Sequence, residues 1–83
     1  MKFTVRPDGV EQYTEEFFNG YGVSVIRGEY TYGGKEGLYE LAVLKGGSLC
    51  YDTCITDDVI GYLSMEQVKD IIQMVQQLPH VLI

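Results

Sequence analysis

One stripe of apolar residues at helical spacing, near the end of the sequence, limits the fold more than any other feature. Ser64 followed by Gln67 matches a capping box, which predicts the start of a helix. Pro79 predicts its end, because proline cannot continue a helix. The apolar positions between them recur on one side of that helix: Met65, Val68, Ile71, Ile72, Val75 and Leu78. We expect this stripe to pack on one face of a sheet.

Strand patterns fill the sequence before the predicted helix. Alternating apolar and polar residues, or short continuous apolar runs, bounded by turn residues, are typical of β-strands. The segments with this character are residues 3–6, 10–18, 21–27, 38–44 and 49–55. Residues 56–63 are interpreted as a crossover into the helix. The sequence predicts a single α+β domain over residues 1–83, an antiparallel β meander of about four to five strands with one C-terminal amphipathic helix packed on one face.

Two connections and the strand after them carry specific predictions. Asn19-Gly20 is the dipeptide best suited to a type I′ hairpin turn, in which both central residues have positive φ. Residues 28–37 hold too much glycine for a regular element and predict a long connection or a bulged hairpin. Residues 38–44 are almost continuously apolar, which predicts a central strand covered on both faces.

The charge balance narrows the classes of partner. Twelve acidic residues against six basic ones give a net charge of -6, which repels nucleic-acid phosphates and anionic lipid headgroups. Neither direct nucleic-acid binding nor membrane binding is therefore expected, whereas a basic protein surface would be attracted. No apolar run has the length of a signal peptide or a membrane-spanning helix, so we expect a cytoplasmic protein.

The residue types that usually carry catalysis are poorly arranged here. The only histidine, His80, lies near the chain end, where a fixed geometry beside a nucleophile is difficult to maintain. Cys50 and Cys54 share a face of a predicted strand with their Cα atoms about 13 Å apart, too far for a disulfide. We interpret them as two small packed thiols, and expect a non-enzymatic protein without a cofactor or metal.

One enzymatic alternative stays open. Carboxylates that converge near the end of a strand suit Mg²⁺ or Ca²⁺, and three acidic residues follow the predicted strand closely enough to do so. A small metal-dependent enzyme would use Asp52, Asp57 and Asp58. The competing interpretation is that Asp57 or Asp58 caps a short helical turn at residues 59–62.

Tyrosine is unusually frequent, with seven tyrosines and no tryptophan in 83 residues. They cannot all be buried with satisfied hydroxyls, so we expect several at the surface, where tyrosine is an efficient contact residue. The glycine-rich loop carries two of them between two glutamates and predicts an acidic binding surface. The alternative is that the tyrosines only fill half-exposed sheet positions. The predicted interaction residues are Glu29, Tyr30, Tyr32, Glu36, Asp52, Asp57 and Asp58.

Four stretches resemble small uncharacterised acidic proteins of tailed phages and prophages. They are NGYGVSVIR at residues 19–27, YGG at 32–34, GLYELAVL at 37–44 and TDDVIG at 56–61. The resemblance implies a protein that binds and inhibits a host protein, as anti-CRISPR proteins and DNA mimics do. It brings no catalytic motif and no residue role.

Two hypotheses of function follow. The first is a non-enzymatic inhibitor, encoded by a phage, that blocks a host nucleic-acid-handling protein through its acidic, tyrosine-rich surface. The second is a homodimeric structural or assembly protein that pairs through an edge strand or through the apolar residues 81–83 at the end of the chain.

Overall fold

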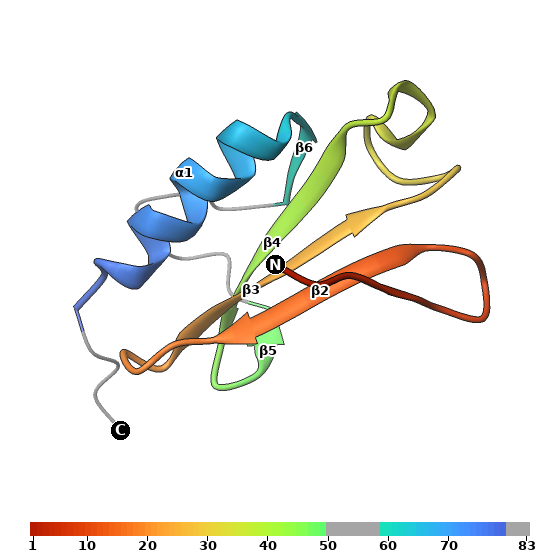
Figure 1. Cartoon of the computed structure of the whole chain (residues 1–83). Helices are drawn as coiled ribbons and strands as arrows, with labels where there is room; N and C mark the ends of the chain where they lie inside the picture. The colour runs from red at the N-terminus through yellow and green to blue at the C-terminus, as the bar shows by residue number, and fades with distance from the viewer. Residues whose placement is uncertain (50–58, 80–83) are drawn as a thin grey trace.

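The computed structural model describes residues 1–49 and 59–79, which form an antiparallel sheet with one helix lying across it (Figure 1). This confirms the predicted α+β class and the C-terminal helix. The elements in chain order are β1 (Thr4–Val5), β2 (Glu11–Glu16), β3 (Tyr21–Arg27), the short 3₁₀ helix η1 (Gly34–Glu36), β4 (Tyr39–Lys45), β5 (Ser48–Leu49), β6 (Ile60–Leu63) and α1 (Met65–Gln76).

The strands from β1 to β5 are neighbours in the order of the chain, and each pair is antiparallel. Strand β6 returns to the same sheet and pairs antiparallel with β4. Because β3 occupies one edge of β4, the other edge is shared: β5 pairs with Leu44 and Lys45, and β6 pairs with Tyr39 and Leu41. Strand β4 is therefore the centre of the sheet.

Helix α1 covers one face of the sheet and packs on β3, β4 and β6. Burial of each apolar side chain there contributes about 1.5–3 kcal/mol relative to exposure. The buried cluster takes alternate residues of the strands and one stripe of the helix: Val23, Val25, Leu41, Val43, Leu63, Val68, Ile72 and Val75. The remaining members of the predicted stripe, Met65, Ile71 and Leu78, are partly buried against this cluster. The predicted helix face and its packing on the sheet are confirmed.

Strand β4 is buried along four consecutive residues, from Leu41 to Leu44. Side chains alternate between the two faces of a strand, so Leu41 and Val43 lie on the side of α1 while Ala42 and Leu44 lie on the opposite side. Burial on both sides confirms the prediction that the apolar segment forms a central strand.

Both ends of α1 have polar partners. At the start, the Gln67 backbone N–H donates to Ser64 Oγ at 3.2 Å and the Ser64 N–H donates to Gln67 Oε1 at 2.9 Å, which confirms the predicted capping box. At the other end, Asn19 Nδ2 donates to the carbonyl oxygens of Val75 at 2.8 Å and Leu78 at 3.0 Å. Asn19 adds a side-chain donor to carbonyls at the end of α1, where the regular backbone hydrogen bonds of a helix run out, and so ties the β2–β3 hairpin to α1.

The hairpin turn at Asn19-Gly20 lies where it was predicted, but the predicted type I′ geometry is wrong. Asn19 does not have a positive φ, whereas Gly20 has a φ of 88°. The Gly20 N–H donates to the Phe17 carbonyl at 3.1 Å, and the Phe17 N–H donates to the Tyr21 carbonyl at 2.7 Å. This is a turn closed by a left-handed glycine, the three-residue hairpin class. It leaves the Asn19 side chain free to reach α1.

The interpretation of residues 56–63 as a crossover without a strand is wrong for its second half, because Ile60–Leu63 forms β6. Only four residues long and interrupted by Gly61, this strand lacked the alternation by which strands are recognised. The predicted strand over residues 49–55 is described only at its first residue, in β5. Cys50, Cys54 and residues 80–83 lie outside the described residues.

Candidate interaction surface

The loop formed by residues 28–37 connects β3 to β4 and contains η1. It lies at one end of the sheet, beside the first residues of β4, and the β2–β3 hairpin lies at the opposite end (Figure 1). The loop holds four of the predicted interaction residues: Glu29, Tyr30, Tyr32 and Glu36.

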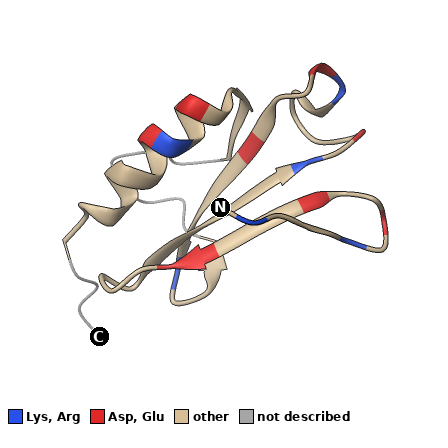
Figure 2. Ribbon diagram, viewed as in Figure 1, with Lys and Arg blue, Asp and Glu red and all other residues tan. Residues whose placement is uncertain are grey.

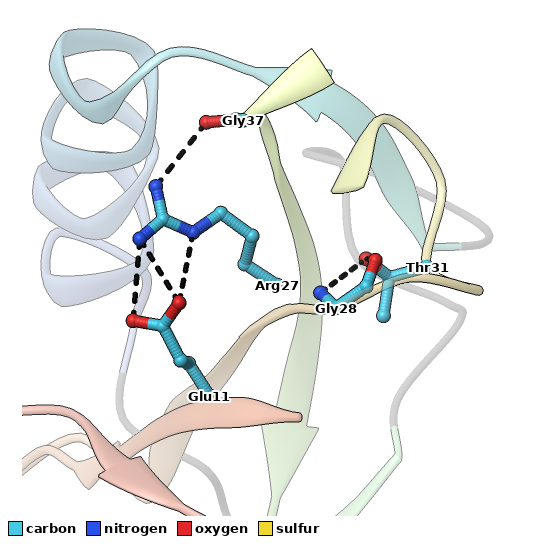
Figure 3. A network of polar contacts seen from close by, with 5 residues as sticks. All are labelled: Glu11, Arg27, Gly28, Thr31 and Gly37. Atoms are coloured by element: carbon cyan, nitrogen blue, oxygen red, sulfur yellow. Dashed lines mark hydrogen bonds and ion pairs between the residues drawn. The ribbon is translucent and has the colours of Figure 1, made fainter. Parts of the chain in front are cut away.

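The first turn of the loop is closed by the Thr31 hydroxyl, which bonds to both backbone groups of Gly28 (Figure 3). The Gly28 N–H donates to Thr31 Oγ1 at 2.9 Å, and Oγ1 donates to the Gly28 carbonyl oxygen at 3.0 Å. The next turn follows at once, since the Gly34 N–H donates to the Thr31 carbonyl at 3.0 Å. These backbone groups of the loop are thus satisfied within the loop itself.

Arg27 holds the last residue of the loop against the sheet (Figure 3). Its guanidinium forms a two-pronged ion pair with Glu11, with Nη2 3.0 Å from Oε1 and 3.2 Å from Oε2, and it donates to the Gly37 carbonyl at 3.4 Å. The same group lies over the Tyr39 ring, 4.7 Å from its centre. Two parallel hydrogen bonds to one carboxylate restrict the orientation of the guanidinium more than a single hydrogen bond would.

The middle of the loop packs directly on β6. The Tyr62 N–H donates to the Tyr32 carbonyl oxygen at 3.1 Å, and the Tyr32 N–H donates to Glu40 Oε1 at 3.1 Å. Glycine permits this approach: a Cβ on Gly61 would overlap the Cβ of Tyr32, and a Cβ on Gly33 would lie 2.9 Å from the Tyr62 Cα. Gly33 also has a φ of 89°, which side chains other than glycine rarely adopt.

A β-bulge in β6 turns Tyr62 toward this loop. Leu41 pairs with Ile60 while Tyr39 pairs with Leu63, so β6 carries one more residue than β4 over the same interval. The extra residue lets Ile60 and Leu63 both pack against the core, although three positions separate them. Tyr62 is the only non-glycine with positive φ among residues 1–49 and 59–79, at 57°. This conformation costs about 1–2 kcal/mol for a side chain other than glycine.

Three tyrosines are displayed at this end of the sheet, and we call them the tyrosine surface: Tyr30, 90% exposed, and Tyr32 and Tyr62, each 59% exposed. Tyr30 and Tyr62 line an open depression with a volume of about 250 Å³. Its other lining residues are Glu29, Thr31, Gly33, Lys35 and Glu36.

The structure brings together four of the seven residues predicted from the sequence and adds one that the sequence reasoning did not select. Glu29, Tyr30 and Glu36 line the depression, and Tyr32 is exposed next to it. Tyr62 joins them from a distant segment, and the only signal for it was a glycine inside a short strand pattern, which often marks a bulge. The other predicted residues, Asp52, Asp57 and Asp58, lie outside the described residues.

Acidic residues lie on several elements, among them α1, β2, β4 and the loop between β3 and β4 (Figure 2). With Asp52, Asp57 and Asp58 set aside, nine acidic and six basic residues remain. The ion pairs among the described residues are Arg6–Asp8 and Arg27–Glu11. Neither Glu29 nor Glu36 has an ion-pair partner in that part of the chain, and both are exposed.

A second, larger depression of about 670 Å³ lies at the opposite end of the molecule. The β2–β3 hairpin and the end of α1 line it, with Phe18 fully exposed at the hairpin tip. Its polar wall includes Glu15, Glu16 and Gln76. Because the chain continues past Pro79 beyond the described residues, we assign no site to this depression.

Within residues 1–49 and 59–79, no group of three or more histidine, cysteine, aspartate or glutamate side chains is placed to hold a metal ion. No helix of that part of the chain has the length and apolarity needed to cross a membrane. The chain matches no protein-family model, and comparisons with curated proteins and with solved structures find no similar protein. The resemblance to small phage proteins therefore stays a prediction.

Proposed function

We propose that this protein is a non-enzymatic interaction module that binds a partner protein through the tyrosine surface. The observation that carries the proposal is the exposure of Tyr30, Tyr32 and Tyr62 on backbone segments that are hydrogen-bonded to each other and to the sheet. Exposed tyrosine offers a large contact area with few rotatable bonds, so little entropy is lost on binding. A loop that is already held in place reduces the cost of binding further.

Two features support a narrower form of the proposal, a phage-encoded inhibitor that blocks a host nucleic-acid-handling protein. Proteins that bind nucleic acids carry basic surfaces, and a net charge of -6 attracts such surfaces. Two carboxylates without an ion-pair partner among the described residues, Glu29 and Glu36, lie beside the tyrosines. Inhibition would be stoichiometric, since the bound module covers a surface that the partner uses for nucleic acid.

The test is affinity capture from bacterial lysate with the tagged protein and a double variant, Tyr30→Ala with Tyr32→Ala, followed by mass spectrometry. Both side chains are exposed, so the variant should melt at the same temperature as the wild type. We expect a nucleic-acid-binding protein to be retained by the wild type at low salt, to be weakened at high salt, and to be lost with the double variant.

Phe18→Ala is the matched control, because it removes a fully exposed aromatic ring from the opposite end of the molecule. Capture should persist with this variant. If the wild type, the double variant and Phe18→Ala all retain the same proteins, the tyrosine surface is not a binding site and the proposal fails.

A second candidate function, a homodimeric assembly protein, is favoured by one observation. Strand β1 pairs with β2 only at Glu11 and Gln12, so the outer edge of β2 from Tyr13 to Glu16 has no strand partner among the described residues. An open edge is a template for pairing with a second copy. Light scattering at increasing protein concentration tests this: a dimer that Thr14→Pro disrupts would support edge pairing, and a monomer at all concentrations would exclude it.

A further inference from the structure

The depression at the tyrosine surface combines aromatic rings with carboxylates, a combination that selects cations. Tyr30 and Tyr62 line it together with Glu29 and Glu36. A tyrosine ring face attracts a cation within about 6 Å of its centre, and a carboxylate adds a charge-assisted hydrogen bond. An anion would be repelled by the two carboxylates.

Lys35 lines the same depression and its charge opposes that of the glutamates. One ammonium against two carboxylates leaves the rim with a net negative charge. Lys35 has no ion-pair partner among the described residues, so the structure does not show its ammonium neutralising either glutamate. The electrostatic preference for a cation therefore remains.

The size of the depression limits the occupant. At about 250 Å³ it is smaller than the sites of 300–1,000 Å³ that usually enclose a cofactor or drug-sized molecule. It also lies open on an exposed loop, where a projecting side chain of another protein has access.

We propose that this depression receives an arginine side chain of the partner protein, between Tyr30 and Tyr62 and beside Glu29 and Glu36. Arginine suits the site better than lysine because its planar guanidinium stacks on aromatic rings and bonds to carboxylates through paired N–H groups. The molecule already contains one such arrangement, in which the Arg27 guanidinium bonds to Glu11 and lies over the Tyr39 ring. The inference rests on the proposed function, because it names the group that the tyrosine surface recognises.

The test is an NMR titration of the labelled full chain with the peptide acetyl-Gly-Arg-Gly-amide. Two companion peptides replace arginine by citrulline, which has the same shape without the charge, or by lysine. For the arginine peptide we expect saturable shifts of backbone amides confined to residues 29–37 and 60–62, with a dissociation constant of about 1 mM. The lysine peptide should bind several-fold more weakly, and the citrulline peptide should produce no saturable shift.

Two matched variants separate site binding from general attraction to an acidic protein. Glu29→Gln with Glu36→Gln removes the two carboxylates of the depression, and should weaken binding of the arginine peptide about tenfold. Glu66→Gln with Asp70→Asn makes the same change in net charge on the exposed side of α1, and should leave binding unchanged.

The inference is overturned if arginine and citrulline peptides shift the same amides equally, if both charge variants weaken binding alike, or if no shift is seen up to about 10 mM peptide, ten times the expected dissociation constant. Any of these results can coexist with capture of a protein that depends on Tyr30 and Tyr32, in which case the proposed function stands and only the arginine pocket fails. If the arginine peptide binds as expected but no protein is captured in a way that depends on Tyr30 and Tyr32, the arginine pocket stands and the proposed function fails.

Discussion

The backbone N–H of Tyr62 donates a hydrogen bond to the carbonyl oxygen of Tyr32 at 3.1 Å, which joins the loop after β3 to the bulge of β6. Both tyrosines project from this junction into solvent, each 59% exposed. Their spacing is therefore determined by main-chain contacts rather than by their own side chains. Changes to the junction should alter the surface even where no tyrosine is replaced.

The left-handed conformation of Tyr62 predicts an unusual order of stability. Glycine adopts a φ of 57° without a steric penalty, whereas alanine does not. The free energy of unfolding of Tyr62→Gly should therefore be about 1 kcal/mol higher than that of Tyr62→Ala. Urea denaturation of both variants measures the difference. At Thr14, an exposed strand residue that does not have positive φ, the order should be reversed, with Thr14→Gly less stable than Thr14→Ala. The same order at both positions would contradict the bulge geometry.

Replacing either of two glycines of the loop by alanine should lower the free energy of unfolding, but by different amounts. Gly33 and Gly37 both have positive φ, at 89° and 76°. A Cβ added to Gly33 would lie 2.9 Å from the Tyr62 Cα and 3.0 Å from the Leu38 Cβ, whereas a Cβ added to Gly37 would meet nothing within 4 Å. Gly37→Ala should lower the free energy of unfolding by about 1–2 kcal/mol, the cost of the backbone conformation alone. Gly33→Ala should cost at least about 1 kcal/mol more, because the loop must also move away from β6. Equal losses in urea denaturation would show that loop and strand are not in contact.

The buried side-chain amide of Asn19 should contribute strongly to the stability of the fold. It is 5% exposed, donates to three carbonyls at and just beyond the end of α1, and accepts from the Tyr21 N–H at 3.1 Å. Asn19→Ala should lower the free energy of unfolding by about 2–3 kcal/mol, because the carbonyls at the end of α1 lose a side-chain donor and the Tyr21 N–H loses its side-chain acceptor. Gln12→Ala, which removes a part-buried bond to Ser24, is the control and should cost less than about 1 kcal/mol.

The Asn19→Asp variant gives a second measurement of the same contact. Its carboxylate would face the helix carbonyls with like partial charge, so it should be at least as unstable as the alanine variant at pH 7. Stability should recover partly below about pH 4, where the carboxyl is protonated and able to donate again. A variant as stable as the wild type at pH 7 would exclude the described contact.

Tyr13 predicts a loss of stability at alkaline pH. Burial raises the pKa of its phenol to about 12, and the hydrogen bond that the hydroxyl donates to Glu15 and the negative charge of that carboxylate add to the effect. The unfolded phenol titrates near 10, so the folded state retains the proton longer. The stabilisation is complete below about pH 10 and is lost as the pH rises through about 12.

Tyr13→Phe isolates this contribution, because it removes the phenol hydroxyl and keeps the ring. The free energy of unfolding of the wild type should fall more steeply than that of Tyr13→Phe between about pH 9.5 and 11.5. Absorbance titration of the folded protein should show one late-ionising phenol that the variant lacks. Parallel pH dependence of the two proteins would contradict the raised pKa.

Local patterns predicted most of the elements. The stripe from Met65 to Leu78 and the Ser64–Gln67 pair specified α1, and β3 has the predicted bounds at Tyr21–Arg27. These predictions succeeded because the spacing of apolar side chains along one segment determines which face can be buried, whatever the rest of the chain does. The predicted tyrosines of the loop are likewise exposed, since glycine-rich connections run over the surface.

Long-range contacts decided what local patterns left open. Strand β6 is too short to show a period of its own and exists because the free edge of β4 supplies its hydrogen bonds. Asn19 is suited to the turn by its local propensity, but the carbonyls of α1 determined where its amide points. The same holds for Tyr62, whose backbone is held in a disfavoured conformation by pairing on both sides of the bulge.

The sequence by itself determined the class of fold, the helix and its buried face, and the loop that displays Tyr30 and Tyr32, because each depends on residues close together in the chain. The tertiary structure alone decided that Tyr62 joins that loop and that Glu29, Glu36 and two tyrosines line one depression. Such a surface depends on the pairing of β6 with β4, and hydrogen bonds between segments distant in sequence leave no periodic pattern from which the pairing can be predicted.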